Sequence, residues 1–138
     1  MKLAPQLAFK GECRQAFDYY AKLFGGEITV MNTFGGNEDH ELPPGSVAGP
    51  AEKIRFAEVR FHNNTLRGND VNADEFVPLG GFHVSLHVAS AAEASRIFDG
   101  LKQGGRVTAP LGKVDWAKLF GMVVDRFGVP WLVLALDE

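Results

Sequence analysis

Two segments of the chain repeat apolar or aromatic residues every three or four positions, which is the spacing of an amphipathic helix. In the first segment the shared face comprises Cys13, Ala16, Phe17, Tyr20, Leu23 and Phe24. In the second it comprises Ala94, Ile97, Phe98 and Leu101. A glycine pair follows each segment, at 25–26 and at 104–105, and glycine commonly ends a helix in the left-handed conformation. Ser90 and Glu93 form a capping-box pattern at the start of the second helix. The pattern therefore predicts two helices with defined ends.

Most of the remaining apolar residues favour β-strands, separated by turn signals at Asn63-Asn64 and at 126–128. The predicted strands are Leu3–Phe9, Glu27–Thr33, Lys53–Phe61, Thr65–Asn69, Phe82–Val88, Arg106–Leu111, Gly121–Asp125 and Val129–Leu136. The order is strand, helix and three strands, and this order occurs twice. Asn63-Asn64 is typical of a tight turn between two antiparallel strands.

The two halves match when the chain is shifted by 78 residues. Ala16 falls on Ala94, Tyr19 on Ile97, Tyr20 on Phe98 and Leu23 on Leu101. Any two amphipathic helices show some match when slid past each other, but the strand order and the glycine pairs agree as well. One helix on a short sheet buries its apolar face poorly, and a second such module can complete the burial. We therefore predict one α+β domain over 1–138, with modules at about 1–70 and 80–138.

Composition narrows the class of protein further. The chain has 138 residues, 46% of them hydrophobic, which is enough for one buried core. Its net charge of −3 argues against partners bound through bulk positive charge, so we expect neither a nucleic acid nor a membrane surface. Cys13 is the one cysteine, which excludes an internal disulfide. No apolar run is long enough to cross a bilayer, and the first residues lack a signal pattern, so the expected location is cytoplasmic.

Several sequence blocks carry a resemblance to a known family. They are Ala8–Cys13, Ala16–Tyr20, Leu23–Glu27, Trp116–Gly121 and Asp125–Trp131. In this order and spacing they resemble the PhnB-like branch of the vicinal oxygen chelate superfamily, which includes glyoxalase I, extradiol dioxygenases and the bleomycin and fosfomycin resistance proteins. The resemblance covers essentially the whole chain. It implies two βαβββ modules whose curved mixed sheets surround a cavity, and it points towards a homodimer.

The same resemblance implies where a divalent metal would be held. The superfamily places ligands near the starts of the first and fifth strands and within the fourth and eighth. Here those positions are Pro5, Arg67 or Gly68, His83 and Leu132. Only His83 can ligate a metal, and a shift that brought in Gln6 would not supply a ligand on the eighth strand. The sequence therefore predicts an incomplete metal site and no cofactor.

The other histidines and the cysteine favour structural roles. His83 and His87 lie four residues apart on a predicted strand, so their side chains are about 13 Å apart and too distant to share one ion. Cys13 lies on the apolar face of the first helix, where burial raises the pKa of a thiol and disfavours a nucleophile.

Glu58 is the most informative acidic residue. Strand periodicity places it on one face with Phe56 and Arg60. A carboxylate beside an aromatic ring inside a curved sheet could have a raised pKa and act as a general base. The alternative, which we favour, is an exposed or arginine-paired glutamate on a solvated face.

Three aromatic residues lie close together in the last part of the sequence. Trp116 follows a polar stretch and is the best candidate for a ring that faces a ligand or a second copy of the chain. Phe120 fits a pocket or the core equally well, and Trp131 fits the core better.

The leading hypothesis is a small-molecule-binding protein of the PhnB-like type without a complete metal site. Its candidate ligand-binding residues are Trp116, Phe120, Glu58, His83 and Arg67. One alternative is a divalent-metal-dependent lyase, isomerase or dioxygenase, and another is a structural dimer without a ligand. The name demethylubiquinone methyltransferase is often attached to PhnB-like proteins, but this chain has no glycine-rich nucleotide loop. The long polar segment Phe34–Pro50 could cover a binding site.

Overall fold

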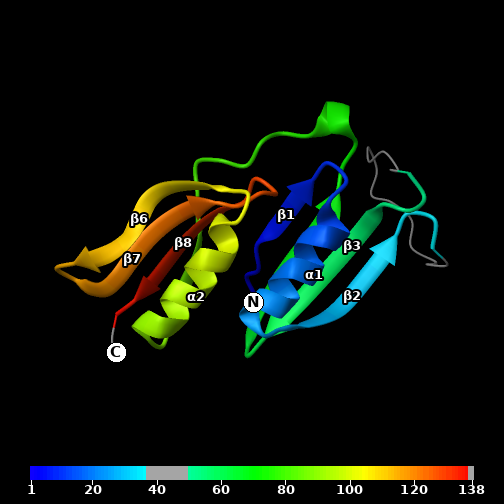
Figure 1. The fold of residues 1–138 in the computed structure, drawn as a ribbon. Coiled ribbons are helices and arrows are strands. Elements are labelled where there is room, and N and C mark those ends of the chain that lie inside the picture. The colour runs from blue at the N-terminus through cyan, green and yellow to red at the C-terminus, as the bar shows by residue number, and fades with distance from the viewer. Residues whose placement is uncertain (37–49, 137–138) are drawn as a thin grey trace. The chain divides into compact units, whose positions relative to one another are not determined.

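The chain divides into two compact units, Met1–Val77 and Pro78–Glu138, in a computed structural model that describes residues 1–36 and 50–136. Each unit has the element order β-α-β-β-β, and in each the helix lies across one face of a four-stranded sheet (Figure 1). The two βαβββ modules predicted from the sequence are therefore present. Most of the segment Phe34–Pro50 lies outside the described residues, and so does His40.

The first unit contains β1 (Gln6–Phe9), α1 (Cys13–Phe24), β2 (Glu27–Thr33), β3 (Ile54–Phe61) and β4 (Asn64–Asp70). Its sheet order is β1-β4-β3-β2. β1 runs parallel to β4, and the other neighbours are antiparallel, which makes the sheet mixed. A 3-10 turn at Ala73–Glu75 follows β4.

The second unit repeats this arrangement with β5 (Val84–Val88), α2 (Ala91–Lys102), β6 (Arg106–Val114), β7 (Ala117–Val124) and β8 (Pro130–Ala135). Its sheet order is β5-β8-β7-β6, and β5 is parallel to β8. The two helices begin 78 residues apart, at Cys13 and Ala91, and end 78 residues apart, at Phe24 and Lys102. The internal repeat inferred from the sequence is thus reproduced by the helix bounds.

The helix ends follow the predicted chemistry with two differences, both at α2. Its C-cap is Gln103 in an extended conformation, and Gly104, with a φ of 70°, comes one residue later. Gly25 has a φ of 71°, and the N–H of the cap donates to the carbonyl of Ala21. At the start of α2 the Ser90 hydroxyl accepts from the Glu93 backbone N–H at 3.1 Å. The carboxylate of Glu93 pairs with Arg96 at 2.7 Å instead of completing the capping box. Only the hydrogen bond to the serine side chain of the predicted capping box is therefore formed, because Arg96, one turn later, pairs with the glutamate carboxylate.

Each helix buries its apolar stripe against the sheet of its own unit. The buried positions of α1 are Cys13, Ala16, Phe17 and Tyr20, and those of α2 are Ala94, Ile97, Phe98 and Leu101. A side chain at Gly68 in β4 would place its Cβ 2.6 Å from the ring of Phe17. A side chain at Gly121 in β7 would lie 2.9 Å from the ring of Phe98. In both units a glycine in the sheet thus allows a helix aromatic to pack closely.

Several predicted strand boundaries were wrong. β5 begins at Val84 rather than at Phe82, and the other main differences concern β6, β7 and β1. β6 and β7 extend towards each other as far as the pair Val114 and Ala117. The polar stretch that leads to Trp116 therefore belongs to a tight hairpin rather than to a loop. Cross-strand pairing extends both strands there despite their polar sequence. β1 begins at Gln6 rather than at Leu3, which is 90% exposed and has no sheet to pack against. Neither described helix has both the length and the apolar character needed to cross a bilayer.

Candidate functional site

The candidate site of the first unit lies on the sheet face opposite α1, which we call the open face. In β4, Leu66 and Gly68 point towards the helix, so the intervening Arg67 points the other way. Cross-strand partners share a face, and Arg67 is paired with Gln6 of β1 and with Glu58 of β3. The open face of this unit therefore carries polar and charged residues. They are Gln6, Glu27, Thr29, Glu58, Arg60, Arg67 and Asn69, and the Phe56 ring lies among them.

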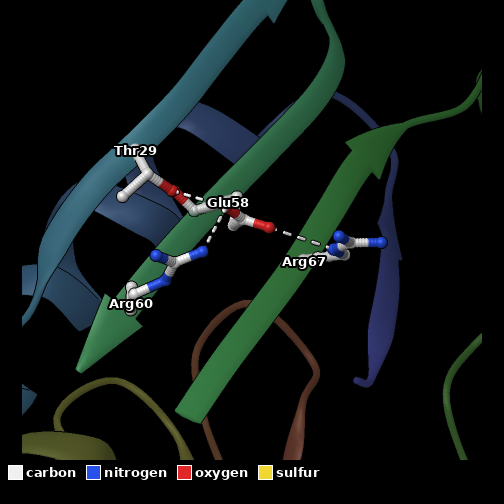
Figure 2. Close-up of polar contacts among 4 residues, drawn as sticks. All are labelled: Thr29, Glu58, Arg60 and Arg67. Atoms are coloured by element: carbon white, nitrogen blue, oxygen red, sulfur yellow. Dashed lines mark hydrogen bonds and ion pairs between the residues drawn. The ribbon is translucent and has the colours of Figure 1, made fainter. Parts of the chain in front are cut away.

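Glu58 is the centre of a cluster of polar contacts on this face (Figure 2). The Thr29 hydroxyl donates to its Oε2 at 2.7 Å, and the Nε of Arg67 donates to its Oε1 at 3.1 Å. The Nη2 of Arg60 lies 3.8 Å from Oε2. Both carboxylate oxygens thus have partners from neighbouring strands, and the side chain is only 9% exposed.

These partners settle which way the acidity of Glu58 moves. The hydrogen bond from Thr29 lowers its pKa most, burial acts in the opposite direction, and the hydrogen bond and charge of Arg67 lower the pKa further. The net direction is downward. The hypothesis of a general base with a raised pKa was wrong, because the hydrogen bonds outweigh the desolvation that would raise it. The arginine-paired alternative agrees with the contacts, although the carboxylate is buried rather than solvated.

Arg67 makes one further contact on the open face, and a polar pair lies next to it. Its guanidinium carbon lies 5.5 Å from the centre of the Phe56 ring, within the range of a cation–π interaction. Beside it, the Gln6 side-chain amide donates to Asn69 Oδ1 at 2.9 Å. The sequence prediction included Arg67 and Glu58 as separate candidates, and the structure brings them together.

Thr29 was missed by the sequence prediction. It lies in an irregular stretch of β2, between the pairs that Ile28 and Val30 make with β3. Such an extra residue re-aims a side chain, and here it directs a hydroxyl onto Glu58. Nothing in the sequence of β2 indicates this irregularity.

The open face of the second unit is mainly apolar in β7 and β8, and β5 adds the exposed polar residues Ser85 and His87. In β7, Gly121 and Val123 face α2, so Phe120 and Met122 lie on the other side with Leu132 and Leu134 of β8. Trp116, at the tip of the β6–β7 hairpin, is 56% exposed. Its ring packs edge-on against that of Phe120, with 5.2 Å between the ring centres. The structure thus joins two more of the predicted candidates.

The two histidines of the second unit are exposed, whereas Trp131 lies in the core. His83 is exposed and immediately precedes β5, and the Nε2 of His87 lies 3.1 Å from the hydroxyl of Ser85. Trp131 is fully buried and donates from Nε1 to Asp125 Oδ2 at 2.8 Å, which confirms its predicted place in the core.

The donor set of this chain does not fit the metal that its fold family uses. Pro5 precedes β1, Gly68 faces α1, and Leu132 carries no donor atom. Gln6 is paired with Arg67, whose positive charge would repel a cation. Among residues 1–36 and 50–136, no group of three or more His, Cys, Asp or Glu could hold a metal ion.

A hollow of about 410 Å³ lies at the start of α1 in the first unit. The carboxylate of Asp70 closes its inner side by accepting from the backbone N–H groups of Gly11, Cys13 and Ile54. Lys53, also at the hollow, donates to the Gly11 carbonyl at 3.0 Å. These groups hold the helix start to the sheet. Cys13 beside them is buried, and that burial raises the pKa of its thiol, as predicted.

Comparison with known proteins identifies this class of fold. A bleomycin-binding protein from Streptomyces verticillus is 14% identical, with a TM-score of 0.59, 98% of this chain and 95% of that chain covered. At this identity the likeness shows the fold alone. Together with the βαβββ repeat, it places the chain among proteins of the glyoxalase and bleomycin-resistance fold.

The more similar relatives define the family. The sequence model of the family described as 3-demethylubiquinone-9 3-methyltransferase matches residues 1–134, and the chain belongs to this family. Protein PA1353 from Pseudomonas aeruginosa is 35% identical with a TM-score of 0.85, covering 100% of this chain and 99% of that chain. The PhnB protein from Bacillus cereus is 24% identical with a TM-score of 0.75, covering 98% and 99%. Protein YjdN from Escherichia coli K12 is 32% identical over 100% of this chain and 97% of its own length. The PhnB-like resemblance is thereby confirmed.

Proposed function

We propose that this protein binds a small molecule against the open face of a sheet and does so without a complete metal site. The observation that carries the proposal is Glu58, a charged carboxylate that is nearly buried in the middle of a strand, on the face that the helix does not cover. Burying a charge is costly unless it is fully paired, and such a group adds little to stability compared with an apolar side chain. Perturbed carboxylates of this kind are concentrated at functional sites.

The second unit supports the proposal with a different chemistry. Its Trp116 and Phe120 rings form an aromatic pair, and Trp116 is more than half exposed. A large exposed ring of this kind suits a flat or apolar part of a ligand. His83 stays a candidate ligand-binding residue because it is exposed at the start of β5.

The donor chemistry disfavours the two enzymatic alternatives. A metal-dependent lyase, isomerase or dioxygenase needs several protein ligands that leave open coordination positions, and His83 is the one competent ligand among the implied positions. A methyltransferase needs a bound methyl donor, and the sequence contains no Gly-x-Gly-x-x-Gly loop. The methyltransferase description therefore names the family of this chain, and binding is the activity that its residues support best.

Native mass spectrometry of protein purified without chelator tests the proposal. We expect a carried-over small molecule and well under one equivalent of zinc, nickel, manganese or iron. Trp116→Ala should weaken retention of that molecule by about 1–3 kcal/mol, the usual effect of losing a buried aromatic contact. Val107→Ala is a suitable control, because Val107 is 41% exposed on the same hairpin but is paired with Val123 on the α2 side.

Two results would contradict the proposal. A stoichiometric metal ion that disappears in His83→Ala would favour the metal-dependent enzyme. Protein that carries no small molecule, and that binds neither charged nor uncharged aromatic probes, would favour the structural dimer.

A further inference from the structure

Arg67 is held on one side by contacts within its own sheet. Its Nε donates to Glu58 Oε1 at 3.1 Å, and its guanidinium lies over the Phe56 ring. Thr29 in turn holds the other oxygen of the carboxylate at 2.7 Å. A guanidinium fixed at Nε and over a ring has lost much of the freedom of an exposed arginine, so a ligand that binds it has less ordering to impose.

The rest of the Arg67 guanidinium is left available. Arginine has five N–H donors, and the ion pair with Glu58 uses only the one at Nε. Neither terminal nitrogen has a hydrogen-bond partner within the part of the chain that the structure describes, and the side chain is 40% exposed. Figure 2 shows the far end of the guanidinium directed away from Glu58. A purely structural arginine–carboxylate pair is frequently bidentate through two nitrogens, whereas this one leaves both terminal nitrogens free.

The charges of the cluster are also unbalanced. Two guanidinium groups, those of Arg60 and Arg67, lie against one carboxylate. The lowered pKa of Glu58 means that the carboxylate is ionised at neutral pH, and the three side chains together carry one positive charge. The Gln6–Asn69 pair next to Arg67 adds polar groups and no charge. Glu27 is the cross-strand partner of Arg60 and offsets part of this charge, so the terminal nitrogens of Arg67 are the part of the cluster best placed for an anion.

From this geometry we infer that Arg67 is the anchor for an oxyanion of the bound molecule, a carboxylate or a phosphate, gripped by its two terminal nitrogens. The inference rests on the proposed function and names the chemical class of its ligand. Glu58 and Phe56 are positioning residues, because they orient the guanidinium and do not touch the anion. A planar carboxylate and a phosphate share this fork-shaped recognition.

Matched aromatic probes test the inference on the full chain. Isothermal titration calorimetry compares 1-naphthoate and 1-naphthyl phosphate with the uncharged 1-naphthamide, and the Arg67 Nε–H signal in nitrogen-15 NMR reports the site. We expect at least one anionic probe to bind about tenfold or more tightly than the amide. Whichever of the two anionic probes binds more tightly indicates whether the ligand's own anionic group is a carboxylate or a phosphate ester.

Variants separate charge from geometry. Arg67→Gln should abolish the preference for the anion, and Arg67→Lys should restore it only in part, because lysine keeps the charge and loses the fork. Glu58→Gln removes the carboxylate that orients Arg67 and should shift the Arg67 Nε–H signal. Arg96→Gln is the matched control, since Arg96 is a 50% exposed arginine in a glutamate pair on α2, and it should leave the preference unchanged.

The failures are distinguishable. Equal binding of naphthoate, naphthyl phosphate and naphthamide, unaffected by Arg67→Gln, would overturn the oxyanion anchor and leave the proposed binding function in place. An anion preference that survives Arg67→Gln and Arg67→Lys would overturn the assignment to this residue. No binding of any probe up to about 10 mM would overturn the oxyanion anchor, and it would overturn the proposed function as well if native mass spectrometry also finds no carried-over small molecule.

Discussion

At the scale of single residues, the buried carboxylate of Glu58 illustrates how a sheet tolerates a charge. Removing a carboxylate from water is costly, and the cost is offset only where both oxygens find donors. Thr29 and Arg67 supply those donors from the strands on either side of β3. They lower the pKa of Glu58 against the opposing effect of burial, so folding favours the ionised carboxylate.

A pH dependence of stability follows from that lowered pKa. The ordinary pKa is 4.5, so the folded-state value lies below it. The ionised carboxylate therefore stabilises the fold above about pH 4.5 and loses this effect as the pH falls through the folded-state pKa. We expect Glu58→Gln to reduce the free energy of unfolding by about 1–2 kcal/mol at pH 7. Urea unfolding from pH 7 to pH 3 should show the difference from wild type shrinking on the acid side.

Glu93→Gln provides the comparison. Glu93 also has a lowered pKa through its partner Arg96, but both side chains of this pair are largely exposed. Solvent screens exposed pairs, so the expected effect is a few tenths of a kcal/mol. A Glu58→Gln protein whose stability curve runs parallel to that of the wild type at every pH would contradict the assigned role of the charge.

At the scale of elements, one aromatic side chain of each helix packs against a glycine in the sheet of its unit. Gly68 admits the ring of Phe17, and Gly121 admits the ring of Phe98. Because each unit has one contact of this kind, the close approach of helix and sheet is a repeated property of the module rather than of one half. The packed side chains of each core leave little room to adjust.

Gly68→Ala tests this contact. The added methyl would lie 2.6 Å from the Phe17 ring, and we expect a loss of about 1–3 kcal/mol in the free energy of unfolding because of overpacking. Gly80→Ala is the control, since a Cβ there meets no atom within 4 Å. Combining Gly68→Ala with Phe17→Leu should recover part of the loss. Equal stability of Gly68→Ala and Gly80→Ala in chemical denaturation would show that the helix can shift at no cost.

The elements themselves were largely predictable. The helix stripes and the glycine stops are local signals, so α1 and α2 could be placed from three- and four-residue spacing alone. The β6–β7 hairpin turn at Trp116 could not be placed in this way, because cross-strand pairing extends both strands and the polar sequence does not indicate it. The candidate site was predictable only in part. Alternation placed Glu58 with Phe56 and Arg60, but the partnership with Thr29 depends on an irregularity in β2 that has no sequence signal.

At the scale of the whole molecule, two units with the same topology present different chemistry. The open face of the first unit carries Glu58, Arg60 and Arg67, whereas that of the second carries Phe120 and Leu132 with Trp116 at its edge. The repeat preserves the element order and the helix bounds, and the open faces have diverged. The two open faces therefore offer different contacts, charged on the first unit and largely apolar on the second.

The homodimer expected from the sequence stays a prediction. Small chains gain buried surface by pairing, and symmetric pairs are the commonest assemblies. We expect a mass of about 30 kDa by light scattering, twice the 15.0 kDa of one chain. A mass that stays at that of the single chain throughout the micromolar range would contradict the dimer. Neither the sheet topology nor the anion test depends on the result.

The parallel pairing of first and last strands has a consequence for how the protein is made. β1 has no neighbour other than β4, and β5 has none other than β8 within the described sheets. On the ribosome, the first module must therefore wait for Asn64–Asp70 to emerge before Gln6–Phe9 has a partner, while the β3–β4 hairpin joins strands separated by only two residues. Closing such long loops is slow compared with forming hairpins. We therefore expect each module to close last at its parallel strand pair.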